Sequence, residues 1–146
     1  MTSATSNEFL TIRDWHEAVV GGKELILRRT SALEHLQLFG GYVWERKIDV
    51  YARQPGPFEN INYHIVDSFD GIAAVRFGNV LCTSVNQTIN DMLDDFDNID
   101  EQSLAEGLSR YYYAHGKSFR GLSIKPENID CFNLMKDWAI EYYDEV

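Results

Sequence analysis

The stretch NVLCTSVNQTINDMLDDFDNIDEQ, residues 79–102, contains the switch between the two halves of the predicted fold. Residues 80–82 form a short apolar run that is typical of a buried strand. A polar cluster follows, and beyond it Val85, Ile89 and Phe96 have the spacing of the buried stripe of a helix. Ser84 is the predicted cap of this helix, because a serine side chain can accept a hydrogen bond from a backbone N–H of the first turn.

The chain before this switch is predicted to form a helical lead-in followed by a sheet. Residues 8–40 contain two short helical patterns that flank one strand pattern. Thr11 is the predicted cap of the first helix, and Thr30 or Ser31 that of the second. Residues 42–83 carry the alternating apolar and polar pattern of further short strands. We therefore expect four or five strands in a small sheet.

The chain after the switch is predicted to be helical over residues 84–146, with about three packed helices. Asp100 is the expected cap of the second of these helices. Residues 1–7 are expected to be a loose tail. The pattern shows no repeat and no second core, so residues 1–146 are predicted to form one domain. The expected fold class is α+β, with a mainly antiparallel sheet between short N-terminal helices and a C-terminal helical group.

Composition limits the class of protein. The chain has 146 residues, of which 45% are hydrophobic, and this is enough for one folded core. No apolar run approaches the roughly 20 residues that a membrane helix needs, so we expect a cytoplasmic protein without a membrane segment. Cys82 and Cys131 both have apolar neighbours, which favours two buried thiols over a disulfide.

The net charge of −10 is distributed unevenly along the chain. Acidic and basic residues balance up to Gln54, and the remainder carries the whole acidic excess. Binding to nucleic acid depends on clustered lysine and arginine, so an acidic chain is unlike a nucleic-acid-binding domain. The acidic excess predicts either a basic protein partner or a surface that is only solvated.

No pattern of residues predicts catalysis, a metal or a cofactor. Cys82 or Ser84 could be a nucleophile, but no histidine is adjacent, and helix capping explains Ser84. The aspartates that follow resemble a calcium loop only in part. Ile99 stands where an oxygen ligand is needed, and Asp100 stands where the loop needs glycine. Phosphate-binding glycine motifs are absent from the sequence.

One concentration of basic residues is present on either side of the second predicted helix. Its members are Arg28, Arg29, Arg46 and Lys47. These residues could contact nucleic acid or an acidic partner, and they could equally be solvated charges beside strands.

Aromatic and acidic residues of the helical half are the candidates for binding a protein partner. Three consecutive tyrosines from Tyr111 cannot all face inward from one helix, and aromatic residues are favoured at interfaces. Ordinary amphipathic packing is the alternative interpretation. The partner-binding candidates are Asp94, Asp95, Asp97, Tyr112, Tyr113, Trp138 and Tyr142.

Three segments together resemble the body of the AbiEi-type antitoxins: LILRRTSALEHLQLFGG, NVLCTSVNQTINDML and DEQSLAEGLSRYY. In that family a short Ser-Ala-Leu helix follows a strand, and a Ser–Thr–Asp segment leads from the sheet into a helix. A further helix with leucines around a Glu follows. The matching residues are Ser31, Ala32, Leu33, Ser84, Thr88, Ile89, Asp91, Leu104, Glu106 and Leu108.

The resemblance covers residues 24–113 and departs from the family in two places. Val85, Asn86 and Gln87 stand where the family commonly has proline and arginine. The part of the chain before the first strand is shorter than the family's winged helix-turn-helix. The resemblance therefore implies an antitoxin body without a full DNA-reading module.

Three functional hypotheses follow. The leading one is a non-enzymatic, cytoplasmic, antitoxin-like protein of a bacterial toxin–antitoxin or phage-defence system. It would neutralise a toxin encoded by the neighbouring gene, need no cofactor or metal, and could form a homodimer. The runner-up is a DNA-binding regulator of its own operon, although nucleic acid is an unexpected partner for this chain alone. The third is a small enzyme that uses His64 with Asp67 or Asp70.

Overall fold

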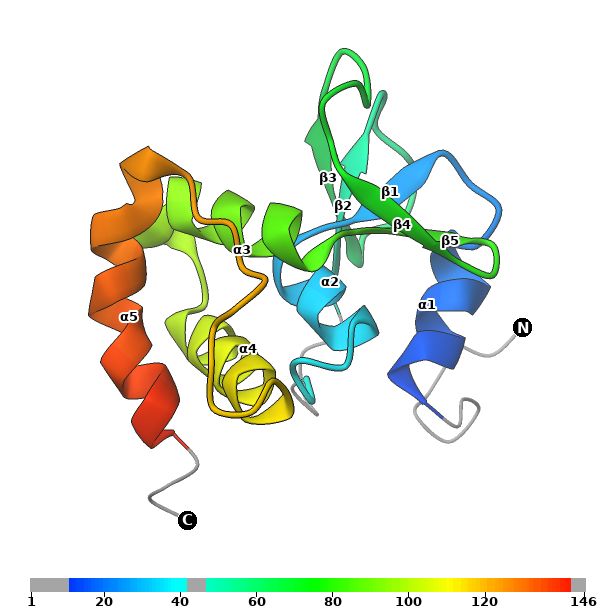
Figure 1. Ribbon diagram of the computed structural model, residues 1–146. Helices are drawn as coiled ribbons and strands as arrows, with labels where there is room; N and C mark the ends of the chain where they lie inside the picture. Colours follow the sequence, from blue (N-terminus) through cyan, green and yellow to red (C-terminus); the bar gives the residue numbers. More distant parts are fainter. Residues whose placement is uncertain (1–10, 42–46, 143–146) are drawn as a thin grey trace.

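The computed structural model describes residues 11–41 and 47–142, which form an α+β fold with a five-stranded sheet (Figure 1). The helices are α1 (Ile12–Val20), α2 (Arg29–His35), α3 (Val85–Asp94), α4 (Glu101–Ala114) and α5 (Ile129–Glu141). The strands are β1 (Leu25–Leu27), β2 (Ile48–Ala52), β3 (Ile61–Ile65), β4 (Ala74–Phe77) and β5 (Val80–Thr83). Two short 3₁₀ turns, η1 (Phe96–Asn98) and η2 (Pro126–Asn128), precede α4 and α5. None of these helices is both long and apolar enough to cross a membrane.

The sheet is mixed, with the strand order β3-β2-β1-β5-β4. β1 pairs with β2 and β4 pairs with β5 in antiparallel fashion, whereas β1 with β5 and β2 with β3 are parallel pairs. The expectation of a mainly antiparallel sheet was therefore wrong in this detail. The reason is that a loop over residues 53–60 crosses back from the end of β2 to the start of β3, instead of turning as a hairpin.

Local capping bonds confirm the predicted starts of three helices. Thr11 and Asp14 form a complete capping box at α1. Ser84 accepts a hydrogen bond from the Gln87 backbone N–H at α3, and Asp100 accepts one from Ser103 at α4. Each of these bonds joins residues only three positions apart, which is why the sequence pattern predicts them.

The predicted caps of α2 were wrong. The N-cap residue is Arg28, which makes no side-chain capping bond. The Ser31 hydroxyl instead accepts a hydrogen bond from the Asp49 backbone N–H at 2.8 Å, and the Thr30 hydroxyl lies 3.1 Å from that of Ser103. Both hydroxyls are used to attach α2 to neighbouring elements, and this competes with capping.

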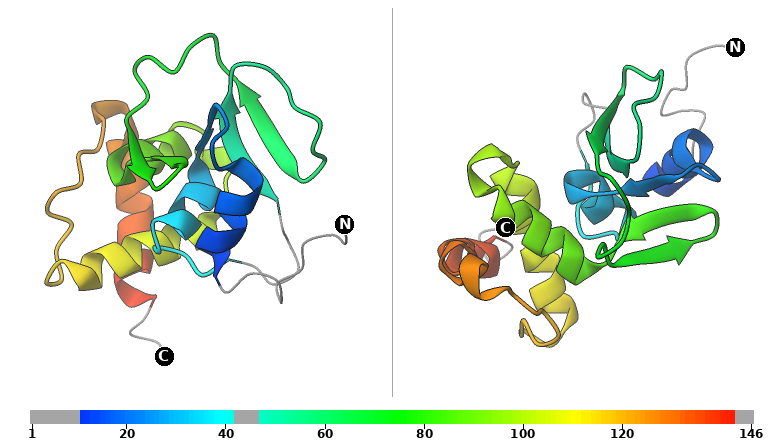
Figure 2. Two further views of the ribbon diagram at one scale, coloured as in Figure 1. Left: turned by 90° about the vertical axis from the view of Figure 1, so that its right-hand side faces the viewer. Right: turned by 90° about the horizontal axis from the view of Figure 1, so that it is seen from above.

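Two apolar cores lie on either side of α2, so the prediction of no second core was wrong. The first lies between one face of the sheet and α1, and the second lies among α3, α4 and α5. Figures 1 and 2 show α1 and α2 on one side of the sheet, with the three C-terminal helices grouped beside it. The chain passes from the first group to the second through β5 and α3, which is the switch that the sequence predicts.

Two consecutive residues of α2 join the cores. Ala32 and Leu33 are both fully buried, but Ala32 packs in the sheet core and Leu33 in the helical core. Gly107 allows α4 to approach this point, because a Cβ atom there would lie only 3.1 Å from a methyl carbon of Leu33. Leu33, one of the family-motif residues, thus lies at the centre of the structure.

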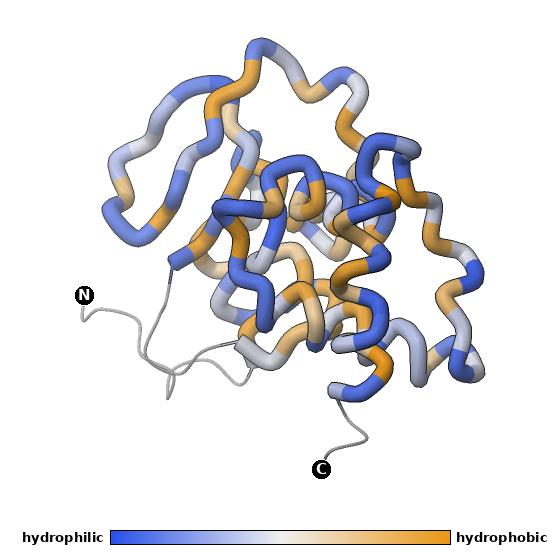
Figure 3. Tube along the Cα trace, turned by 90° about the vertical axis from the view of Figure 1, so that its left-hand side faces the viewer, coloured by the Kyte–Doolittle hydropathy of each residue, from blue (hydrophilic) through white to orange (hydrophobic). Residues whose placement is uncertain are grey.

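The segment that joins α4 to α5, residues 115–125, runs across α3 and is named the connecting strap here (Figure 1). Phe119, Leu122 and Ile124 of the strap pack against the helical core. Figure 3 shows apolar and polar positions following one another along the strap and along α5. This pattern is that of a segment with one side on the core and the other in water.

Candidate functional site

Arg28, one of the predicted nucleic-acid-binding residues, is held inside the fold. Its side chain is buried, and its Nη1 lies 3.1 Å from the Asp49 carboxylate. The guanidinium carbon lies 4.6 Å from the ring centroid of Tyr51, a cation–π distance. Burial raises the pKa of Asp49, and the charge of Arg28 opposes that rise. Arg28 therefore serves as an internal contact between the end of β1 and β2.

Arg29, the next residue, is also used internally. Its Nη2 lies 2.7 Å from Asp95 at the end of α3, so the pair links the two halves of the fold. Hydrogen bonds from Asn98 and from Arg29 lower the pKa of Asp95. The backbone of Arg29 has a φ of 47°, a left-handed conformation that costs a non-glycine residue about 1 kcal/mol. The ion pair helps to hold this strained start of α2.

Of the basic concentration, Lys47 is the remaining residue that the structure describes. Lys47 is exposed, and Arg46 lies outside the described residues. Of the three basic residues that the structure describes, Arg28 and Arg29 are each paired with a carboxylate, whereas Lys47 is exposed to water.

The family-motif residues of α3 attach this helix to the sheet. Thr88 is fully buried and shares a 2.6 Å hydrogen bond with the Thr83 hydroxyl at the end of β5. Asp91 is buried and accepts hydrogen bonds from the Tyr51 hydroxyl at 2.7 Å and from the Gln87 amide at 2.8 Å. The Gln87 side chain thus hydrogen-bonds Asp91 and does not bond the backbone of the N-cap residue Ser84. The motif residues Thr88 and Asp91 therefore hold α3 against the sheet.

His64 lies near these charges. Its ring meets the edge of the Tyr51 ring, with the centroids 5.4 Å apart. Burial and then the charge of Arg28 lower the pKa of His64, while Asp49 and Asp91 act in the opposite direction. No hydrogen bond or ion pair joins His64 to Asp67 or Asp70 in the part of the chain that the structure describes. The pairing that the enzyme hypothesis requires is not formed.

The Tyr51–Asp91 bond yields a stability prediction. Burial and the hydrogen bond to Asp91 raise the pKa of Tyr51 to about 12, so the phenol stays protonated as a donor at neutral pH. Tyr51→Phe should lower the free energy of unfolding by about 2 kcal/mol, because a buried carboxylate loses a donor. Urea unfolding measures this. Tyr63→Phe is the matched control, because the Tyr63 hydroxyl accepts only a long, exposed 3.4 Å bond. Equal losses in the two variants would contradict the prediction.

The predicted acidic candidates at the end of α3 lie beside the start of α5. Asp94 contacts Lys125 at 3.3 Å and accepts a hydrogen bond from Asn128 at 2.8 Å. Asp95 is paired with Arg29, and Asp97 is exposed. Two of these three carboxylates therefore have cationic partners within the chain.

The three tyrosine candidates, Tyr112, Tyr113 and Tyr142, lie where α4 and α5 pack together. Tyr112 packs on Phe119, and the Tyr113 hydroxyl donates to the Ile140 carbonyl at 2.7 Å. The Tyr142 hydroxyl donates to Glu106 at 3.3 Å. Tyr142 follows α5, roughly 20 Å of helix beyond Asn128. Asp94 and Tyr142 thus lie at opposite ends of α5, with Trp138 on the helix between them, so the predicted acidic and aromatic residues do not form one patch.

The outer side of α5 has an exposed apolar row that joins Trp138, a predicted partner-binding candidate, to Leu134, which the sequence pattern did not single out. Leu134 is 71% exposed and Trp138 is 41% exposed, and their four-residue spacing places them on adjacent turns of one side. The signal was present in the sequence. Phe132, Met135 and Ala139 already complete the buried stripe of this helix, so a second apolar row must lie outside it.

Carboxylates accompany this row. Asp130, Asp137 and Glu141 are exposed on the same helix, where Lys136 is the exposed cation. At 100° per residue, all three carboxylates fall within about 60° of Leu134 around the helix axis. We call the row and these acids, residues 130, 134, 137, 138 and 141, the α5 outer face.

No protein-family model, curated protein or solved structure matches this chain. The site must therefore be judged on its geometry. Among the described residues, no three His, Cys, Asp or Glu side chains form a group that could hold a metal ion. Burial raises the pKa of the Cys82 thiol to about 12, which leaves it protonated and unreactive at neutral pH. The α5 outer face is the candidate site that remains.

Proposed function

We propose that this chain is a non-enzymatic, antitoxin-like protein that binds and neutralises a basic partner toxin through the α5 outer face. The observation that carries the proposal is the exposure of Leu134, at 71%, beside the half-exposed ring of Trp138. Exposed apolar groups that adjoin one another on a folded surface commonly mark a binding site for another protein. Tryptophan is also among the residues that contribute most to the energy of interfaces.

Charge supports a basic partner. The three carboxylates of the α5 outer face border the apolar row, as polar rim residues border the core of an interface. The net charge of −10 adds a long-range field that attracts a cationic protein. Rim charges of this kind raise the association rate more than the final affinity.

The runner-up function, regulation of its own operon by DNA binding, has less support. Arg28 and Arg29 are each paired with a carboxylate, so they would have to give up these contacts before neutralising phosphates. A measurement of binding to promoter DNA at low salt, made alongside the toxin assay, tests this second function directly.

Expression with the product of the neighbouring gene tests the proposed function. A tag on this chain should capture that product, and growth should be restored when both are present. Leu134→Ala and Trp138→Ala should each weaken the complex by about 2 kcal/mol, or about thirtyfold in Kd. Ile129→Ala is the matched control, because Ile129 is a 40% exposed apolar residue of α5 that lies outside this face.

The acidic rim has its own readout. Asp137→Asn with Glu141→Gln should slow association about tenfold at low salt and have little effect at high salt. Asp67→Asn with Asp70→Asn removes the same charge from an exposed loop before β4 and should change the rate less. A complex that forms equally well in every α5 variant would refute the proposed surface. So would sedimentation showing that the α5 face instead joins two copies of this chain.

A further inference from the structure

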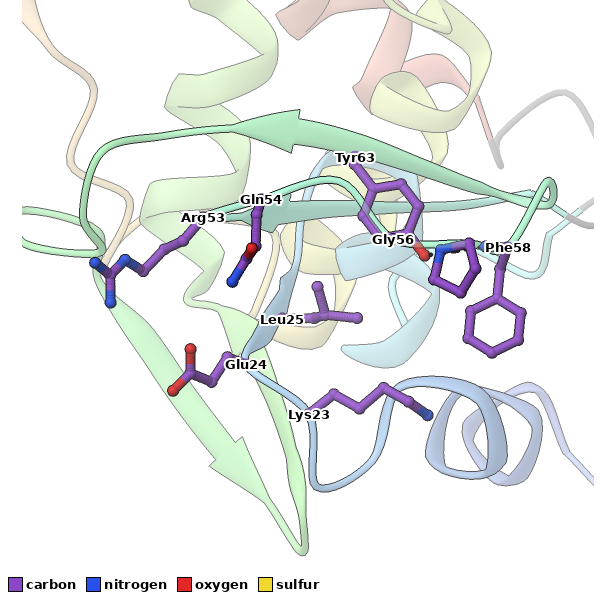
Figure 4. A pocket seen from close by; sticks show the side chains of 9 residues that line it. Lys23, Glu24, Leu25, Arg53, Gln54, Gly56, Phe58 and Tyr63 are labelled. Atoms are coloured by element: carbon purple, nitrogen blue, oxygen red, sulfur yellow. Dashed lines mark hydrogen bonds between the residues drawn. The ribbon is translucent and has the colours of Figure 1, made fainter.

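A pocket of about 320 Å³ lies in the sheet half of the molecule, lined by residues of β1, β3 and the loop before β3 (Figure 4). Its presence follows from the topology. Parallel neighbours such as β2 and β3 usually need a connection of a dozen or more residues with a helix, which covers the sheet. Here residues 53–60 make the connection without a helix. Ile65, which is paired with Ala52, is 48% exposed, so this corner of the sheet has little cover.

The walls of the pocket are largely apolar and come from two segments. Leu25 of β1 and the ring of Tyr63 of β3 face it from the sheet, and Phe58 with Pro57 closes one end (Figure 4). Pro55 and Pro57 each fix a backbone φ angle in the loop, which favours a preformed wall. Two rings and a leucine around a space of this size suit one flat group of one or two fused rings.

The rim is cationic, which is unusual for a chain of net charge −10. Lys23 and Arg53 lie on it together with the carboxylate of Glu24, which leaves one net positive charge. The Lys23 ammonium is held in place, since it donates to the Val19 carbonyl at 2.6 Å and lies 5.7 Å from the Phe58 ring centroid. Among the described residues no ion pair involves Arg53.

We propose that this pocket binds a small aromatic acid with a single negative charge. The ring of the ligand lies between Phe58 and Tyr63, and its carboxylate lies at the rim against Arg53. A planar guanidinium matches a carboxylate with two parallel hydrogen bonds, which selects this group over a neutral one. The site is separate from the α5 outer face, so it is independent of the proposed toxin binding.

Titration of the isotope-labelled chain with naphthoate, followed by NMR, tests the proposal. Saturable shifts are expected at the backbone amides of Gly56, Phe58 and Tyr63. Naphthoate should bind about fivefold more tightly than the neutral analogue naphthalenemethanol. A difference of this size is what a partly exposed ion pair contributes to affinity. Arg53→Gln should remove this preference and leave the affinity for the neutral analogue unchanged. Arg76→Gln, at an exposed arginine of β4, is the matched control and should keep the preference.

Phe58→Ala should weaken both probes alike, because it removes the shared ring contact. The unfolding midpoint of each variant should stay at that of the parent chain, since these side chains are exposed. Equal affinity for the acid and the alcohol would overturn the proposal. Shifts that map to Leu134 and Trp138 instead of to the pocket would overturn it as well.

Discussion

Asn90→Ala should lower the free energy of unfolding by about 3 kcal/mol. Asn90 is buried in α3, where its amide nitrogen donates to the carbonyls of Asn86 and Ser123 at 2.9 and 2.8 Å. Its carbonyl oxygen accepts from the Lys125 backbone N–H and from the Asn128 side chain at 2.9 and 3.2 Å. Every hydrogen-bonding atom of the amide is thus used.

These bonds attach the connecting strap to α3, so the effect should begin locally. The strap has no regular secondary structure of its own, and it depends on such side-chain bonds and on its apolar contacts. Without Asn90 the strap should open before the rest of the molecule unfolds. Trypsin should then cleave after the exposed Lys117 and Arg120 well before it cleaves within the helices.

Urea unfolding and limited proteolysis measure the two parts of this prediction. Asn133→Ala is the matched control, because Asn133 is an exposed asparagine of α5, and its loss should change stability by at most about 0.5 kcal/mol. Two results would contradict the prediction: a loss as small as that of the control, or cleavage of the strap at the rate of the parent chain.

How much of this fold could be predicted depends on the distance between partners in the sequence. The caps at Thr11, Ser84 and Asp100 are contacts over three residues, and the sequence pattern predicts them correctly. The bond between Tyr51 and Asp91 joins residues 40 positions apart. No local pattern contains such a pair, so the motif aspartate was identified while its partner was not.

The same limit explains the basic residues and the sheet. Arg28 and Arg29 look like a cationic patch in sequence, and only the fold brings Asp49 and Asp95 to them. Alternation predicts strands but not which strands become neighbours, so the parallel pairing of β2 with β3 was missed. The exposure of Leu134, in contrast, could have been predicted from local sequence, because Leu134 does not fall on the buried stripe of α5 formed by Phe132, Met135 and Ala139.

Stability should fall by about 3 kcal/mol as the pH is lowered from 6.5 toward 4, because of His35. Burial, and then the charge of Arg13, lowers the pKa of His35 from 6.5 to about 4. The unfolded chain therefore binds a proton at His35 over this range while the folded chain does not. The contribution of neutral His35 to stability is therefore complete above pH 6.5 and is lost as the pH falls from 6.5 to about 4.

The geometry explains why the neutral form is required. His35 of α2 and His16 of α1 are both buried, and their Nδ1 atoms lie 3.1 Å apart. One nitrogen must donate and the other must accept, so protonating the acceptor would place two hydrogens between them. Phe77 covers His35 from β4, and Arg13 donates from its Nε to the His35 carbonyl at 2.6 Å. A proton on His35 would thus meet a second cation and a ring edge, which destabilises the contact between α1 and α2.

Urea unfolding between pH 7.5 and 4 measures the slope, and His35→Asn isolates its cause. Asparagine keeps a polar atom near His16 but does not titrate, so this variant should start less stable and lose less as the pH falls. His64 and Asp49, whose pKa values are also shifted, contribute equally to the slopes of the parent chain and of His35→Asn. Their contributions therefore cancel when one slope is subtracted from the other. If the His35 variant shows the same slope as the parent chain, the buried histidine pair is not the origin of the acid sensitivity.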